Sequence, residues 1–153
     1  NGAKISIDEE VPFGNAVRPI GEGYKTDDIL IQKGTKIGFA QIGVMAGLNT
    51  VMVKVAIRPR VAVISTGSEI LDLGVNSDNS AQIRSSNNYT LAALFEQAGA
   101  EVIQLGTVGD DKQNIMDTFQ NALSSADILV STGGVSVGDY DFVKDIVPSL
   151  GCE

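Results

Sequence analysis

Apolar and polar residues follow a regular order in the second part of the chain. Short, β-branched apolar runs lie at residues 61–64, 101–105 and 127–130, and each is followed by Gly, Ser, Thr or Asp and then by a stretch with helical spacing. Such a repeat is typical of a parallel sheet with helices on both faces. The pattern therefore predicts a three-layer α/β fold with a mostly parallel sheet from residue 60 onward.

Three helices are expected in this part. For the first, Ser86 or Asn87 is a suitable N-cap, Gly99 a suitable end, and the predicted buried stripe is Leu91, Leu94, Phe95 and Ala98. Asp110 is the first candidate for the N-cap of the second helix, whose predicted stripe is Ile115, Phe119, Ala122 and Leu123. The third is expected to begin around Asp141, to end or bend at Pro148, and to bury Val143, Ile146, Val147 and Leu150.

Residues 1–59 have a different pattern, and the junction Arg58-Pro59-Arg60 suggests a boundary near residue 59. Short strands are expected at residues 4–7, 28–32 and 51–57, with a helix that starts near Phe39 and stops at Gly47. We therefore expect two parts, a small mixed α+β segment at 1–59 and an α/β domain at 60–153. The first part has few strong apolar segments, so it should pack on its neighbour or on a second chain.

Composition excludes several classes of function. The formal charge of -8 and the dispersed Lys and Arg residues argue against a nucleic-acid surface. Because His is absent and Cys152 is the single cysteine, a Cys/His zinc site, a histidine-based triad and an internal disulfide are excluded. No apolar run approaches the length of about 20 residues that a membrane span needs, so we expect a cytoplasmic protein with no membrane partner.

Polar loops follow all three predicted strands, at residues 65–69, 106–111 and 131–141. In a doubly wound sheet such loops meet beyond the carboxyl ends of the strands, where ligands bind. The predicted rim carries ten acidic and hydroxyl side chains: Glu69, Asp110, Asp111, Asp139, Asp141, Ser65, Thr66, Ser68, Ser131 and Thr132. Carboxylates beside a phosphate suit Mg²⁺, although each acid taken alone could equally be a helix cap.

The loop at residues 131–141 reads Ser-Thr-Gly-Gly-Val-Ser-Val-Gly-Asp-Tyr-Asp. Its glycines would let main-chain N–H groups face an anion, with a phosphate as the expected ligand. Gly138 is followed by Asp139 rather than Lys, so the P-loop pattern fails, and the dinucleotide-binding spacing of glycines is absent. The loop therefore predicts an anion site of another kind.

Four ordered motifs then identify a resemblance. The segments at residues 65–69, 82–87, 108–111 and 131–141 are similar to motifs of the MoeA/gephyrin family of molybdopterin molybdenumtransferases, and residues 17–22 and 33–35 are similar to the stretch that precedes them. The resemblance implies a molybdopterin-binding fold and insertion of molybdate into adenylylated molybdopterin, with Mg²⁺ assisting. It also implies a homodimer in the full-length protein, and residues 60–153 would be a molybdopterin-binding domain truncated at its C-terminus.

The resemblance assigns expected roles to particular residues. Glu69, Asp111 and Asp141 would be catalytic and would organise metal and water. The expected substrate-binding residues are Thr66, Gly67, Ser68, Ser86, Asn87, Ser131, Thr132, Gly133, Gly134, Ser136, Gly138 and Asp139. Two alternatives are an enzyme of the same fold, either a molybdopterin adenylyltransferase or a CinA-type nucleotide hydrolase, and a non-catalytic gephyrin-like scaffold.

Overall fold

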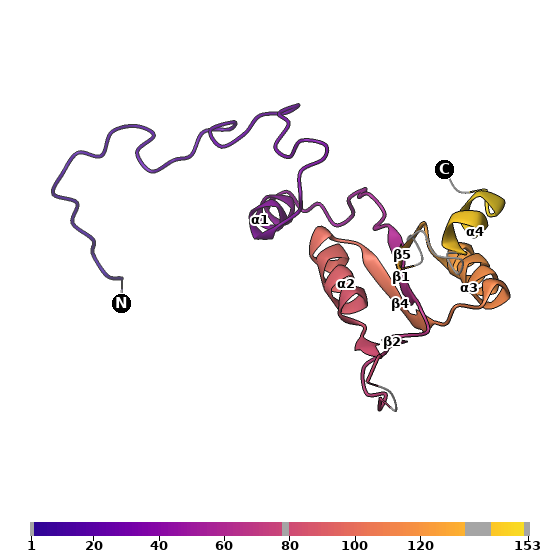
Figure 1. Ribbon diagram of the computed structural model, residues 1–153. Helices are drawn as coiled ribbons and strands as arrows, with labels where there is room; N and C mark the ends of the chain where they lie inside the picture. The colour runs from indigo at the N-terminus through magenta and orange to yellow at the C-terminus, as the bar shows by residue number, and fades with distance from the viewer. Residues whose placement is uncertain (1, 78–79, 134–141, 152–153) are drawn as a thin grey trace. The chain divides into compact units, whose positions relative to one another are not determined.

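The computed structural model describes residues 2–77, 80–133 and 142–151. The chain separates into two compact units, Asn1–Lys54 and Val55–Glu153. The second unit contains the sheet and three of the helices shown in Figure 1.

A three-stranded parallel sheet forms the centre of the second unit. Its order is β4 (Glu101–Val108), β1 (Arg60–Thr66) and β5 (Ile128–Thr132), so β1 is the middle strand. Residues 61–66 of β1 are all buried, as a continuous apolar run in the centre of a parallel sheet should be. All three strands occur where the apolar runs predicted them.

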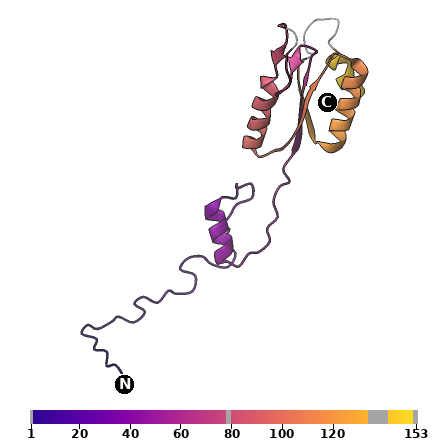
Figure 2. The ribbon, with the colours of Figure 1, turned by 90° about the horizontal axis from the view of Figure 1, so that it is seen from below.

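Helices cover both faces of this sheet. Helix α2 (Ser86–Ala98) packs on one face, whereas α3 (Lys112–Ser125) and α4 (Val143–Ser149) lie on the other, as Figures 1 and 2 show from two directions. The three-layer α/β architecture predicted from the sequence is therefore confirmed. The helix that follows β1 lies on one face and the helices that follow β4 and β5 lie on the other, which is the arrangement that opens a crevice beyond the strand ends.

The main core lies between the sheet and the second face. Its buried residues are Ile64, Val108, Ile115, Phe119, Val143 and Ile146. The stripe predicted for α3 is confirmed, because Ile115, Phe119 and Ala122 are buried and Leu123 is half-buried. In α4, Val143 and Ile146 are buried as predicted, and the helix ends one residue after Pro148. The predicted start at Asp141 lies outside the described residues.

Three details of the helix predictions were wrong. The N-cap residue of α2 is Ser85, not Ser86 or Asn87. Asp111, not Asp110, is the N-cap of α3, and its carboxylate accepts a hydrogen bond of 2.7 Å from the N–H of Asn114. In α2 the buried residues are Asn88 and Ala92, whereas the predicted Leu94 is 54% exposed and Ala98 is exposed. The helix is rotated relative to the apolar stripe because polar Asn88 finds buried hydrogen-bond partners, which are described below.

A second, two-stranded parallel sheet lies in the connection between β1 and α2. Strand β2 (Ile70–Leu71) pairs with β3 (Ile83–Arg84). This pairing brings the residues before α2 back towards the end of β1. It thereby shapes the crevice at the carboxyl edge of the main sheet.

The first unit contains helix α1 (Phe39–Gly47), which confirms the predicted helix and its stop. The three strands predicted at residues 4–7, 28–32 and 51–57 were wrong, because residues 2–59 form no strand in the structure. A strand needs a partner for its backbone groups, and none of these segments has one. Within residues 2–54 no side chain is buried, and Phe39 is 92% exposed. That this unit packs on another surface stays a prediction.

Candidate functional site

A small polar pocket lies at the carboxyl edge of the main sheet, where β1 and β5 end and α2 begins. Its volume is about 160 Å³. Eleven residues line it: Ser65, Thr66, Glu69, Ile70, Ile83, Arg84, Ser85, Ser86, Asn87, Thr132 and Gly133. They come from β1, β5, the β2–β3 pair and the first turn of α2, so residues far apart in sequence converge here. The prediction of a crevice at this edge is confirmed for these elements.

The hydroxyl of Ser65, at the end of β1, is the centre of a buried hydrogen-bond network. It lies 2.8 Å from the amide oxygen of Asn88, 2.8 Å from the hydroxyl of Thr132 and 3.2 Å from the hydroxyl of Ser85. Ser65, Ser85 and Asn88 are each at most 6% exposed. The network ties β1, β5 and the start of α2 together beneath the pocket.

Asn88 extends the network to β4. Its amide nitrogen donates a hydrogen bond of 2.7 Å to the carbonyl of Gly106. Gly106 lies at an irregularity in the pairing of β1 with β4, where the register shifts between Val63 and Ser65, and its φ is +73°. This β-bulge explains why the carbonyl of Gly106 bonds to the side chain of Asn88 from α2, and glycine suits the backbone conformation there.

Ser85 is the N-cap residue of α2, yet its side chain makes no capping hydrogen bond. Its hydroxyl is directed to Ser65 instead. The first-turn N–H groups of α2 therefore receive no side-chain cap from Ser85, and Ser86 and Asn87 line the pocket. A helix start with this geometry carries the positive end of the helix dipole towards the pocket.

Gly133 makes a close backbone contact at the other end of the pocket. Its φ is +92°, and a Cβ on this residue would lie 2.2 Å from the carbonyl oxygen of Thr66. The hydroxyls of Thr66 and Ser131 are buried and have no hydrogen-bond partner among the described residues. Buried hydroxyls without partners are uncommon and call for a ligand, a water or a neighbouring segment.

The sequence-predicted residues divide into three groups. Six line the pocket: Thr66, Glu69, Ser86, Asn87, Thr132 and Gly133. Four others lie near the strand ends without lining it: Gly67, Ser68, Asp111 and Ser131. Gly134, Ser136, Gly138, Asp139 and Asp141 lie outside the described residues.

The predicted acids do not gather in the described part of the chain. Glu69 lines the pocket, Asp111 caps α3, and Asp110 accepts a hydrogen bond from the N–H of Ser68. Across residues 2–77, 80–133 and 142–151, no group of three or more acidic or cysteine side chains is arranged to hold a metal ion. Over the same ranges, no helix has the length and apolarity that a membrane crossing requires.

Two residues of the network, Ser85 and Asn88, were missing from the predicted site. Ser85 and Asn88 flank the Ser86-Asn87 pair that the sequence motif indicated, and Ser65 was recognised only as one of several rim hydroxyls. Asn88 has a usable signal, because it lies four residues before Ala92 and seven before Phe95, on the buried face of α2. A polar residue on such a face needs a buried partner.

A second pair of missed residues lies beside this network. The hydroxyl of Tyr89 donates a hydrogen bond of 2.6 Å to the carboxylate of Asp72, which also accepts one from the N–H of Leu73. The bond from Tyr89 lowers the pKa of Asp72, and the same bond raises the pKa of Tyr89. The pair joins α2 to the segment after β2.

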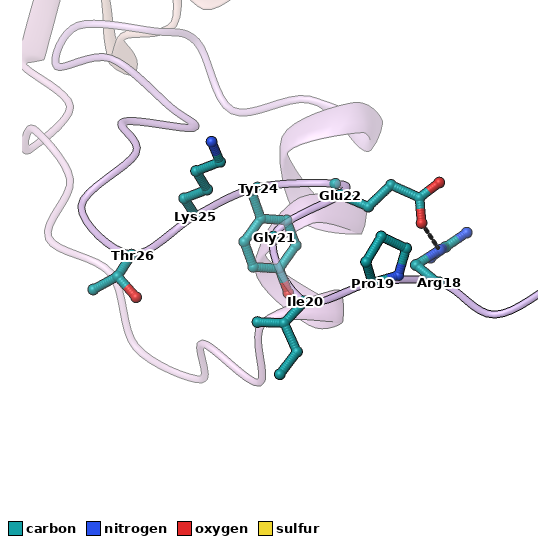
Figure 3. A pocket seen from close by; sticks show the side chains of 9 residues that line it. Arg18, Pro19, Ile20, Gly21, Glu22, Tyr24, Lys25 and Thr26 are labelled. Carbon is teal, nitrogen blue, oxygen red and sulfur yellow. Dashed lines mark ion pairs between the residues drawn. The ribbon is translucent and has the colours of Figure 1, made fainter. Parts of the chain in front are cut away.

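A wider hollow lies in the first unit, with a volume of about 610 Å³. Figure 3 shows that one continuous run of chain, residues 18–26, lines it, with Arg18 and Glu22 forming an exposed ion pair of 3.7 Å. Ile20 in this run is fully exposed. Because no buried polar group faces this hollow, the pocket at the sheet edge is the better candidate site.

Comparison with known proteins identifies relatives of the chain. A protein-family model described as "Probable molybdopterin binding domain" matches residues 62–153. A molybdopterin molybdenumtransferase from a Nostoc species is 42% identical over 140 residues, which are 92% of this chain and 32% of that protein. One from Haemophilus influenzae is 34% identical over 143 residues, 93% of this chain and 35% of that protein. The chain thus spans about a third of the length of these curated relatives.

Solved structures of proteins with related names are also similar to this chain in fold. A molybdopterin biosynthesis MoeA protein from Pyrococcus horikosii superposes with a TM-score of 0.70 at 31% identity, covering 85% of this chain and 31% of that one. A molybdenum cofactor biosynthesis protein from Pyrococcus furiosus superposes with a TM-score of 0.60 at 27% identity, covering 74% of this chain and 36% of that one. The similarity therefore extends from sequence to fold.

Proposed function

The chain belongs to the family of probable molybdopterin binding domains found in molybdopterin molybdenumtransferases, and from this premise we propose that it forms the substrate-binding part of a molybdenum insertase. The proposed substrates are adenylylated molybdopterin and molybdate, and the reaction is the last step of molybdenum cofactor assembly. The curated relatives that match along most of the chain are named molybdopterin molybdenumtransferases. This name favours the insertase over an adenylyltransferase, a CinA-type hydrolase or a scaffold.

One structural observation supports the proposal most directly, namely the start of α2 at the pocket. Ser85 does not cap the helix, and Ser86 and Asn87 line the pocket. Uncapped first-turn N–H groups and the helix dipole attract a phosphate oxygen. Arg84 also lines the pocket, and its guanidinium donates hydrogen bonds to the carbonyls of Asp72 and Val75. The first-turn groups of α2 suit the phosphate of a pterin substrate.

The proposed roles of the carboxylates are a separate matter. The family resemblance assigns Mg²⁺ to Glu69, Asp111 and Asp141. Among the described residues only Glu69 lines the pocket, while Asp111 is engaged as a helix cap and Asp141 lies outside them. The described residues therefore do not fit a magnesium site on their own, and we assign no chemical step to the metal. A homodimer of the whole protein likewise remains part of the proposal.

A charge placed at the start of α2 tests the proposal. Asn87→Asp adds a negative charge in the first turn, where it should stabilise the helix but repel a bound phosphate. We expect it to weaken molybdopterin binding about fivefold at low salt, by calorimetric titration, without lowering the melting temperature. Asn114→Asp is the matched control, since it adds the same charge to the first turn of α3, away from the pocket.

The outcomes separate clearly. Equal weakening by Asn87→Asp and Asn114→Asp would show that the start of α2 does not bind the phosphate. Absence of any binding of molybdopterin or its adenylylated form, with or without Mg²⁺, would sink the proposed function for this chain. Asp111→Asn should preserve the cap of α3, so a loss of Mg²⁺-dependent binding in that variant would support a metal role for Asp111.

A further inference from the structure

The donor and the acceptor of each hydrogen bond in the network beneath the pocket can be assigned, starting from the carbonyl of Gly106. A carbonyl oxygen can only accept, so the group of Asn88 that lies 2.7 Å from it must be the amide NH₂. The amide oxygen of Asn88 then faces Ser65 at 2.8 Å. Because that oxygen can only accept, Ser65 must donate its one hydroxyl proton to Asn88.

The donors in the hydrogen bonds between Ser65 and its two neighbouring hydroxyls follow from this assignment. With its proton committed to Asn88, Ser65 can only accept from Thr132 and Ser85, which lie 2.8 Å and 3.2 Å away. Thr132 and Ser85 therefore donate their protons to Ser65. Each hydroxyl has one proton and two lone pairs, so both are left with acceptor capacity alone. Both residues line the pocket.

We propose that Thr132 and Ser85 form an acceptor-only wall that binds an N–H or O–H donor of the ligand and disfavours phosphate oxygens. An ionised phosphate offers mainly acceptors, whereas a pterin ring carries amide and amino N–H groups. The pterin ring, not the phosphate, should therefore lie against this wall. This orientation rests on the proposed function, whereas the direction of the hydroxyls does not.

Thr66 supplies the opposite polarity in the same pocket. It is 3% exposed, and its hydroxyl has no hydrogen-bond partner among the described residues. Among the described residues nothing accepts its proton, so this hydroxyl can donate to an acceptor of the ligand. Together with the start of α2, it gives the pocket groups that suit an anion. The pocket thus contains both donor-binding and acceptor-binding groups, which would orient a ligand that has both.

Neutron diffraction from a deuterated crystal of the full chain tests the direction without any ligand. We expect deuterium on the Thr132 oxygen pointing to Ser65, and deuterium on the Ser65 oxygen pointing to Asn88. A Ser65 deuterium that points to Thr132, or a Thr132 deuterium that points into the pocket, would overturn the proposal. The result of this experiment does not depend on the proposed function.

Binding measurements test the consequence. Thr132→Val keeps the shape of the side chain but removes the acceptor, and Thr132→Ser keeps the acceptor but removes the methyl group. With 6-hydroxymethylpterin as a donor-bearing probe, Thr132→Val should weaken binding about fivefold to tenfold, and Thr132→Ser less than about twofold. Inorganic phosphate should bind both variants and the wild type equally. Melting temperatures confirm that each variant is folded.

The failures of the two proposals are distinguishable. If the wild type binds molybdopterin but Thr132→Val binds the pterin probe as tightly as the wild type does, the acceptor-only wall is wrong and the proposed function stands. If Thr132→Val weakens phosphate binding instead, the wall binds the anion and the orientation is reversed. If the wild type binds neither molybdopterin nor the pterin probe, the proposed function and the orientation both fail.

Discussion

Ser68 and Asp110 exchange hydrogen bonds across the carboxyl edge of the sheet. The N–H of Ser68 donates to the carboxylate of Asp110 at 2.8 Å, and the N–H of Asp110 donates to the hydroxyl of Ser68 at 3.0 Å. The two residues follow β1 and β4 and are 42 positions apart in sequence. This clamp holds the loop after β1, which includes pocket residue Glu69, to the neighbouring loop.

Removal of the clamp should destabilise the fold measurably. Asp110→Ala loses a charge-assisted hydrogen bond and leaves the N–H of Ser68 without this partner, so we expect the free energy of unfolding to fall by about 1 kcal/mol. Urea denaturation followed by circular dichroism measures the change. Asp117→Ala is the control, because the hydrogen bond from Gln113 to Asp117 is exposed and lies within α3, and its effect should stay below about 0.5 kcal/mol. Equal midpoints for the two variants would contradict the prediction.

The cap of α3 gives a second prediction. Asp111→Ala removes the acceptor for the N–H of Asn114 and should cost about 1 kcal/mol of stability, whereas Asp111→Asn should change it by only a few tenths, since Asn and Asp cap helices about equally well. The same urea titration measures both. If Asp111→Asn is as destabilising as Asp111→Ala, charge rather than capping geometry stabilises this helix start.

Asp110 and Asp111 also show what the sequence could and could not predict. The pattern predicted that an acid caps α3, but two adjacent acids satisfy that rule equally. The choice depends on Ser68, which is brought to Asp110 only by the parallel pairing of β1 with β4. Tertiary contacts of this kind are not visible in local sequence.

The strands at residues 60–66, 101–108 and 128–132 were predictable from their apolar runs. Residues 61–66 of β1 are buried, as in the centre of a parallel sheet, whereas β4 and β5 are mostly half-buried. The segments at residues 4–7, 28–32 and 51–57 also contain β-branched residues, but strand propensity does not supply a partner. The rotation of α2 relative to its predicted apolar stripe depends on Asn88, whose hydrogen-bond partner lies at the bulge at Gly106.

Gly133 should be the most sensitive glycine of the site. In Gly133→Ala the new methyl group would lie 2.2 Å from the carbonyl oxygen of Thr66, at a φ of +92°. We expect a loss of about 3 kcal/mol or more, because both the backbone conformation and the space are unsuitable. Gly99→Ala is the matched control, since its φ is +97° with open space around it, and it should cost about 1 kcal/mol. Similar losses in the two variants would mean that the contact with Thr66 relaxes freely.

The pair of Tyr89 and Asp72 predicts how stability depends on pH. The hydrogen bond from Tyr89 lowers the pKa of Asp72 in the folded state, so its contribution is fully present above the ordinary aspartate pKa and is lost as the pH falls below about 4. The raised pKa of Tyr89 has the opposite sign, because its contribution is present below its ordinary pKa and is lost as the pH rises above about 10. The bond should therefore stabilise the fold between these limits.

Tyr89→Phe removes the hydroxyl and leaves the ring, so it tests this dependence directly. We expect the variant to be less stable than the wild type at pH 7, and the difference between them to shrink at pH 3 and again at pH 11. Urea midpoints at the three pH values measure it, with Tyr24→Phe as the control because Tyr24 is an exposed tyrosine of the first unit. A difference that stays constant across the whole range would mean that the ring of Tyr89, rather than its hydrogen bond to Asp72, holds α2 to the segment after β2.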